Sequence, residues 1–229
     1  MSRKLMITGG VVVLVLATIG AGAFFLFLRD DAPPPAALRT RSGDPSSVGS
    51  TVSVDGTWAV QPGDQVFAGY RMQEKFGGDT VEHTAVGRTP KVSGTMTIDS
   101  GMVTTASFSA DLTALSSDQV RRDRIIKTDG LETNRFPTAT FVLSDPIPLD
   151  TPSTGTVVNT NATGDLTLHG VTKRVTIPIM ARWNGDTIDI SGGTGIVLAD
   201  YQMSPPGVGG FVSVADHGSF ELQLTFVKQ

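Results

Sequence analysis

The sequence predicts an all-β domain of antiparallel strands behind a non-globular N-terminus. In about eight segments between residues 66 and 226, apolar side chains recur at every second position. Clusters of Gly, Asp, Asn and Pro separate these segments. Parallel strands need long crossover connections, and no long helical pattern lies between the segments. A domain of this kind closes either as a sandwich or as a barrel.

Each alternating segment is expected to form one strand, because successive side chains of a strand point to opposite faces. Turn signals such as Asp99-Ser100-Gly101 end the strands. In chain order, the apolar positions are Val66, Ala68, Tyr70 and Met72; Val92, Gly94, Met96 and Ile98; Ala106, Phe108, Ala110 and Leu112; Ala139, Phe141 and Leu143; Leu166 and Leu168; Val175, Ile177, Ile179 and Ala181; Ile188, Ile190, Ile196 and Leu198; and Phe220, Leu222, Leu224 and Phe226.

One charged segment interrupts the strand pattern. Residues 116–137 read SSDQVRRDRIIKTDGLETNRFP, so Ser116 can cap a helix and Asp118 lies in its first turn. Gly130 is a helix-ending residue. We expect one or two short helices here, covering one end of the β domain.

Residues 164–179, GDLTLHGVTKRVTIPI, predict a β-hairpin. His169 and Gly170 form its two-residue turn, and the glycine supplies the positive φ that a primed turn requires. The resulting register pairs Leu168 with Val171, Thr167 with Thr172, Leu166 with Lys173, and Asp165 with Arg174. Lys173 thereby falls on the inward face, where its side chain either extends to the rim or contacts a ligand headgroup.

The N-terminus predicts a membrane anchor. Residues 5–28 carry no charge, and 24 helical residues span about 36 Å, enough for a hydrocarbon core of about 30 Å. Arg3 and Lys4 precede the run, which predicts a single-pass segment with a cytoplasmic N-terminus and an extracytoplasmic β domain. The alternative is secretion after signal cleavage at Ala21-Gly22-Ala23. The apolar run continues past this site, which favours the anchor.

The chain accordingly divides into three parts. Residues 1–31 are the transmembrane anchor, residues 32–54 a flexible linker rich in Pro, Ser and Gly, and residues 55–229 the β domain. The length of the third part suits a single domain. The chain contains no Cys, which excludes both a lipidated cysteine and disulfide bonds, so stability must come from an ordinary core.

Composition excludes several classes of partner. The chain has 18 Lys and Arg against 22 Asp and Glu, a formal net charge of -4. No basic tract interleaves with aromatic residues, so nucleic acid is not an expected partner. Binding to an anionic membrane surface through a polybasic patch is not expected either.

No residue pattern predicts a catalytic or metal site. The three histidines, His83, His169 and His217, each lie beside a turn signal, and no two have the i, i+4 spacing of a helical metal pair. We therefore expect solvated turn histidines. The Gly-x-Ser-x-Gly nucleophile motif is also missing from the sequence.

The inward strand faces bear more directly on function. Several inward residues are small, namely Gly69 or Ala68, Gly94, Ala106, Ala110, Ala139, Ala162 and Gly164. They either leave room for one slender ligand in an eight-stranded barrel or relieve crowding where strands bend. If the interior is open, a ligand lies against Phe108, Leu112, Phe141, Leu166, Leu168, Ile177, Phe220 and Leu222. If it is filled, the same residues form an ordinary core.

Several sequence words resemble a known family. The central ones are FPTATFVLSDPI (136–147) and GDLTLHGVTKRVTIPI (164–179), and the others occur in the family's order: GTWAV (56–60), VSGTMTID (92–99), RRDRIIKTDGLETNRFP (121–137) and GGFVSVADHGSFELQLTF (209–226). Residues 56–226 are similar to the YceI-like polyisoprenoid-binding family, and the closing words to its actinobacterial branch. The histidine that the family often carries within the charged segment is missing here.

The resemblance implies an extended antiparallel eight-stranded lipocalin-like β-barrel with a long apolar tunnel. It further implies that the tunnel holds a long-chain isoprenoid or similar amphiphile, and that no other cofactor is needed. We expect an extracytoplasmic lipid-binding protein, tethered to the cytoplasmic membrane, that stores or transports this ligand at the cell envelope. The alternatives are a structural or interaction module with a filled core, and an enzyme acting on a lipid or redox substrate. The residues specify neither the lipid nor the oligomeric state.

Overall fold

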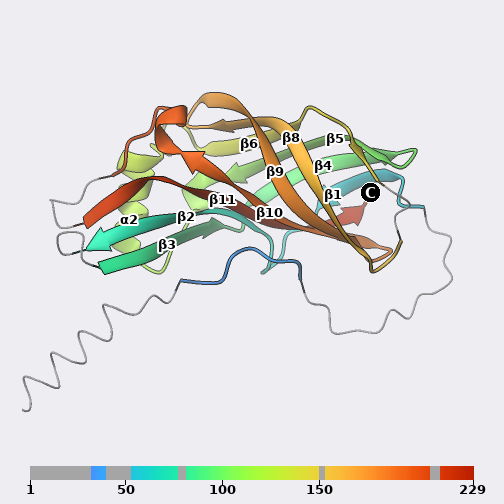
Figure 1. Cartoon of the computed structure of the whole chain (residues 1–229), viewed down its shortest axis with the longest axis horizontal. Coiled ribbons are helices and arrows are strands. Elements are labelled where there is room, and N and C mark those ends of the chain that lie inside the picture. The colour runs from blue at the N-terminus through green and yellow to red at the C-terminus, as the bar shows by residue number, and fades with distance from the viewer. Residues whose placement is uncertain (1–31, 40–52, 77–80, 150–152, 207–211) are drawn as a thin grey trace, which may run out of the picture.

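The computed structural model describes residues 32–39, 53–76, 81–149, 153–206 and 212–229 (Figure 1). These residues form an antiparallel β-barrel with short helical segments. The strands are β1 (Gly56–Val60), β2 (Phe67–Phe76), β3 (Val81–Thr89), β4 (Val92–Asp99), β5 (Met102–Asp111), β6 (Thr138–Leu143), β7 (Ile147–Pro148), β8 (Val157–Leu168), β9 (Val171–Trp183), β10 (Thr187–Val197) and β11 (Val212–Lys228).

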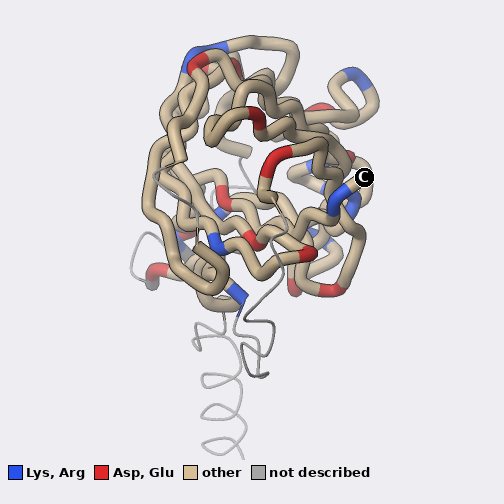
Figure 2. The backbone as a smooth tube through the Cα atoms, turned by 90° about the vertical axis from the view of Figure 1, so that its right-hand side faces the viewer, with Lys and Arg blue, Asp and Glu red and all other residues tan. Residues whose placement is uncertain are grey.

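The barrel closes because one edge of β11 pairs first with β2 and then, near its C-terminal end, with β1. Its residues 226–228 pair with β1, and its residues 212–223 pair with β2. The strand order is β1-β4-β5-β6-β8-β9-β10-β11-β2-β3, with the β1–β11 pairing as closure. Taking β1 with β2, and β3 with β4, as two bent strands gives eight antiparallel strands around one interior. Figure 2 looks along the barrel and shows this ring. The all-β prediction and the eight-stranded closure are confirmed.

The hairpin between β8 and β9 has the predicted register. Asp165 pairs with Arg174, Leu166 with Lys173, Thr167 with Thr172, and Leu168 with Val171. The hydroxyls of Thr167 and Thr172 lie 2.8 Å apart on the outer face. His169 and Gly170 have φ values of 52° and 75°, so both turn residues adopt the positive φ of a type I′ turn.

The charged segment forms the helical cover of one barrel end, at the left of Figure 1. It contains the helix α2 (Val120–Ile125) and the π-helical turn η2 (Ile126–Gly130), and the 3₁₀ turn η1 (Leu112–Ala114) precedes it. The predicted serine cap is wrong, because α2 begins at Val120 with Gln119 as its N-cap. Ser117 instead donates both its amide and its hydroxyl to Asp123, at 2.8 and 2.6 Å. A further 3₁₀ turn, η3 (Leu198–Tyr201), follows β10.

The core lies between the inward faces of the strands. Trp58 and Phe226 are fully buried, and the ring of Phe226 meets that of Phe108 edge to face at 5.5 Å between centroids. The indole of Trp58 donates to the carbonyl of Val54 at 2.9 Å. Val54, the last residue of the predicted linker, is therefore part of the core.

The first eight residues of the predicted linker also lie against the barrel. We call Ala32–Arg39 the strap, because it runs along the outer wall, hydrogen-bonded to side chains of β2, β3, β9 and β11 (Figure 1, blue). This placement differs from the free tether expected from composition. The predicted anchor, residues 1–31, lies outside the described residues. Within the part of the chain that the structure describes, no helix has the length and apolar character to span a bilayer.

Candidate functional site

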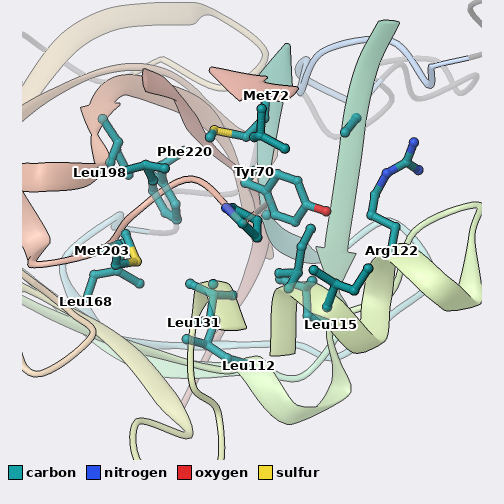
Figure 3. Close-up of a pocket in the computed structure, with 18 of the residues that line it drawn as sticks. Tyr70, Met72, Leu112, Leu115, Arg122, Leu131, Leu168, Leu198, Met203 and Phe220 are labelled. Atoms are coloured by element: carbon teal, nitrogen blue, oxygen red, sulfur yellow. The ribbon is translucent and has the colours of Figure 1, made fainter. Parts of the chain in front are cut away.

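A large cavity lies inside the barrel beneath η1, α2 and η2. We call it the wide cavity; its volume is about 670 Å³, within the range of about 300–1,000 Å³ typical of small-molecule sites. Exposed Gln119, Arg121 and Ser204 contribute to its lining, so it reaches the protein surface beside α2. Figure 3 shows the apolar side chains that converge on it, including Tyr70, Met72, Leu112, Leu115, Leu131, Leu168, Leu198, Met203 and Phe220.

A second cavity continues along the same strands toward the other end of the barrel. This narrow cavity has a volume of about 110 Å³ and is lined mainly by apolar residues of β4 to β11. On β5, Ala110 lines the wide cavity and Phe108 the narrow one. On β6, Ala139 and Phe141 divide in the same way. The two cavities therefore lie in tandem along the barrel interior.

The structure places seven of the eight predicted ligand-contacting side chains on a cavity wall. Leu112, Leu168 and Phe220 line the wide cavity. The narrow cavity is lined by Phe108, Phe141, Ile177 and Leu222. Leu166 lines neither cavity and is 2% exposed in the surrounding core. Their role as ligand contacts stays a prediction.

A buried ion pair forms the polar part of the wide cavity. Arg122 of α2 donates from Nε and Nη2 to the carboxylate of Glu74 on β2, at 2.9–3.2 Å. The side chains are only 10% and 7% exposed, and Arg122 also bonds Asp118 one helical turn earlier. Because each charge has an oppositely charged partner, the cavity wall carries a satisfied pair at this point. The pair also ties the helical cover to the strand wall.

Tyr70 lies beside this pair on the cavity wall. Burial of its side chain raises the pKa of its hydroxyl well above the usual range, and the nearby carboxylate of Glu74 adds to the effect. The hydroxyl therefore stays protonated. Among the described residues its oxygen has no hydrogen-bond partner. Its ring fits against β3 because residue 87 is a glycine: a Cβ at Gly87 would collide with the ring of Tyr70.

These polar residues were not identified from the sequence. Glu74 occupies the next inward position of β2 after Ala68, Tyr70 and Met72. A charged residue at an inward position was the one sign in the sequence that a polar site lies there. Its partner lies 48 residues away along the chain, and only the tertiary structure brings the two together. The helical cover was predicted, but the residue of α2 that faces inward was not.

Lys173 lies at the rim of the barrel rather than on a cavity wall. Its register position faces inward, as predicted, opposite the buried Leu166. The side chain is nevertheless 45% exposed and its ammonium group lies 3.3 Å from Asp200 of η3. A long side chain at the end of the barrel can reach water in this way.

His169 is not the solvated turn residue that the sequence suggested. Its side chain is 9% exposed, its Nδ1 lies 3.1 Å from the carbonyl of Tyr201, and its Nε2 lies 2.8 Å from Glu132. The ring also packs on Phe136, with centroids 4.4 Å apart. The hydrogen bond from His169, followed by that from Arg135, lowers the pKa of the Glu132 carboxyl. This histidine joins the hairpin turn to the loop after η2.

The other two histidines lie elsewhere on the barrel. The expectation that both are turn residues is wrong: His83 lies within β3, and His217 is exposed within β11 beside a shift in register. In the described ranges, no three His, Asp or Glu side chains come together in the manner of a metal site. The side chains that line the wide cavity are mostly apolar, and the ion pair of Glu74 and Arg122 is its charged part.

Solved structures share this architecture. A polyisoprenoid binding domain from Saccharophagus degradans aligns with a TM-score of 0.57 at 16% identity, covering 75% of this chain and 98% of that one. A Campylobacter jejuni YCEI protein aligns with a TM-score of 0.51 at 16% identity, covering 62% of this chain and 84% of that one. At these identities the likeness concerns the fold.

Sequence comparison gives closer relatives. A UPF0312 protein of Vibrio campbellii is 31% identical over 114 residues, which are 47% of this chain and 57% of the relative. A UPF0312 protein of Pseudomonas putida is 33% identical over 123 residues, 50% of this chain and 61% of the relative. This chain thus spans about three fifths of the length of the curated relatives that it matches. The family model for the YceI-like domain matches residues 49–226. The chain therefore belongs to the YceI-like domain family.

Proposed function

We propose that this protein is a lipid-binding barrel that holds one long-chain isoprenoid or similar amphiphile. The wide cavity carries the proposal, because about 670 Å³ of largely apolar space inside a protein core has no structural use and is costly to leave empty. The polyisoprenoid binding domain from Saccharophagus degradans, which shares the fold, supports the class of ligand.

The tandem arrangement suggests how such a ligand lies. An apolar tail in the wide cavity would extend along β5 and β6 toward Phe108 and Phe141, and a rotation of these rings would admit it to the narrow cavity. A polar headgroup would remain at the α2 end, where Arg122 and exposed Gln119 and Arg121 line the opening. Contact between a headgroup and Lys173 at the rim is part of the same proposal.

Mass spectrometry under native conditions tests this function. We expect the purified chain to carry a bound lipid with a long unbranched or isoprenoid tail, and the delipidated protein to take up geranylgeraniol at one equivalent. The matched control is Ala139→Phe, which places a ring in the wide cavity without removing a polar group. Recovery of lipid-free protein that takes up no geranylgeraniol would contradict the proposal.

We also propose that the barrel acts outside the cytoplasm, held at the cell membrane by residues 5–28. The uninterrupted apolar run with Arg3 and Lys4 before it supports this location. The intact mass of the protein, measured in both the membrane and the soluble extracytoplasmic fractions, distinguishes the two forms: the full chain in the membrane is expected for an anchor, and a soluble chain beginning near residue 24 for a cleaved signal peptide. The storage or transport role is not enzymatic in this proposal.

A further inference from the structure

The strap is matched residue by residue to its place on the barrel. Its three prolines, 33–35, have no amide hydrogen and so offer only carbonyl acceptors. Two arginines donate to them: Arg71 of β2 to the carbonyl of Pro33 at 2.7 Å, and Arg88 of β3 to that of Pro34 at 2.6 Å. The first amide after the prolines, that of Ala36, donates to the carboxylate of Glu221 at 3.0 Å.

The receiving surface is a built site. Glu221 points outward from β11, yet it is only 4% exposed. It accepts a bond from Arg88 at 2.8 Å and lies 3.8 Å from Arg71. The guanidinium of Arg88 also stacks on the ring of Phe67, 4.0 Å from its centroid. A buried carboxylate needs several donors, and the strap amide supplies one of them.

The other end of the strap is held by Arg39. Its guanidinium donates to Thr225 at 3.0 Å and to Gln65 at 3.1 Å, and its carbonyl accepts from Arg182. Thr225 in turn donates to Asp189, both fully buried on the outer wall. The strap therefore runs along β11 from Glu221 to Thr225 and is fixed at both ends.

The strap contacts the strands that form one wall of the wide cavity. Arg71 stands on β2 between Tyr70 and Met72, which both line the cavity. The backbone of Arg88 exchanges two hydrogen bonds with Ser116, at 2.9 and 3.0 Å, and the neighbouring Leu115 lines the cavity as well. Among the described residues β3 pairs with β2 alone, apart from this bridge to Ser116. The β2–β3 hairpin is thus a cavity wall with one weakly supported edge.

We propose that the outer wall carries a binding site for an extended proline-rich peptide, that the strap is its resident ligand, and that strap docking braces the β2–β3 hairpin over the wide cavity. Prolines favour the extended conformation before binding, which reduces the ordering cost of docking. Release of the strap loosens the hairpin and speeds exchange of whatever the cavity holds. The bracing of the hairpin is inferred from the hydrogen bonds between strap and barrel. Its effect on ligand exchange rests on the proposed function.

The substitution Ala36→Pro tests the brace in the full chain. It removes the single amide that donates to Glu221, keeps the extended backbone and leaves every barrel residue in place. The matched control is Ala37→Pro, because the Ala37 amide reaches only the neutral side-chain oxygen of Gln223, at 3.4 Å. Only Ala36→Pro loses a hydrogen bond to a charged acceptor. This loss should lower the equilibrium constant for strap docking by about tenfold to hundredfold.

Two readouts follow the brace directly. For Ala36→Pro we expect tryptic cleavage after Arg39 to accelerate at least tenfold and amide hydrogen exchange across β3 to rise by about tenfold, with β4 and β5 unchanged; Ala37→Pro should resemble the wild type. Arg39→Ala, which detaches the other end of the strap, should raise β3 exchange in the same way. Unchanged Arg39 cleavage, or faster cleavage with unchanged β3 exchange, would overturn the proposal.

The ligand effect is measured separately with dansyl-labelled farnesol. We expect Ala36→Pro to release the probe severalfold faster than the wild type and Ala37→Pro to release it at the wild-type rate. Equal release rates in all three proteins, with β3 loosened, would overturn the link between strap and cavity. If the wild type binds no probe, the proposed function fails, and the β3 exchange still decides the brace.

Discussion

The two halves of the barrel interior share β5, β6, β8, β10 and β11 but enclose very different volumes, about 670 Å³ at the α2 end and about 110 Å³ at the other. Ala110 and Ala139 are cross-strand neighbours in the wide half, and Phe108 and Phe141 are neighbours two residues further along. Two methyl groups in the wide half thus correspond to two aromatic rings in the narrow half, and the rings occupy volume that the methyl groups leave open.

The two halves also differ in polarity. Glu74 and Arg122 form a buried ion pair on the wall of the wide half, whereas the narrow half is lined by aliphatic and aromatic side chains with a few hydroxyls. Charge near the surface opening and apolar walls further in match the two ends of an amphiphile. One barrel can therefore combine a packed core in one half with open space in the other.

The largest expected effect comes from removing a ring of the narrow half. Phe141→Ala should lower the free energy of unfolding by about 3–5 kcal/mol, because Phe141 is 7% exposed and leaves a cavity. It should also join the two cavities, so that the variant takes up longer isoprenoids than the wild type. Denaturant unfolding and native mass spectrometry measure the two effects. A stable variant with an unchanged ligand range would show that Phe141 does not divide the interior.

A comparable effect is expected at the ion pair of the wide half. Arg122→Met leaves the carboxylate of Glu74 buried beside the cavity without its partner, which should cost about 3–5 kcal/mol in urea unfolding. The double variant Glu74→Leu with Arg122→Met removes both charges and should recover most of the loss. If the double variant is as unstable as the single one, the pair acts through packing instead of charge.

A smaller effect on stability is expected when one alanine in each half is replaced by phenylalanine. Ala139→Phe places its ring in open space and should leave the melting temperature nearly unchanged while blocking lipid uptake. Ala162→Phe adds the same ring to the narrow half, where overpacking should cost about 1–3 kcal/mol. Thermal unfolding of the two variants in parallel checks this. Equal destabilisation would mean that the wide cavity does not persist in solution.

The smallest expected effect concerns acid stability at the hairpin turn. Hydrogen bonds from His169 and Arg135 lower the pKa of Glu132 in the folded protein. The corresponding stability is present above the unfolded pKa of about 4.3 and is lost as the pH falls through the lower, folded value. Glu132→Gln should therefore flatten the decline of the melting temperature between about pH 5 and pH 3. Asp111 and Asp216 also have lowered pKa values, so the melting temperature of the variant should still fall to some extent as the pH decreases.

Much of the fold could be predicted because its signals are local. The two-residue period of strands such as β5 marked their inward faces, and the His169-Gly170 turn fixed the β8–β9 register in full. The candidate cavity residues followed from the same parity, and seven of the eight line a cavity. The environment of His169 could not be predicted, since Glu132 and the Tyr201 carbonyl reach it from segments more than 30 residues away.

The amino-acid sequence by itself determined most of the strands, the hairpin register, the position of the helical cover and the family, because each depends on neighbours along the chain. It did not predict β3, which contains His83. Only the tertiary structure decided where the interior is open, which charges meet at Glu74 and Arg122, and that the strap lies on the wall. Ala36 and Glu221 are 185 residues apart, and a proline-rich segment has the same composition whether it is free or docked. Docking depends on donors and acceptors that come into position only after the barrel has closed.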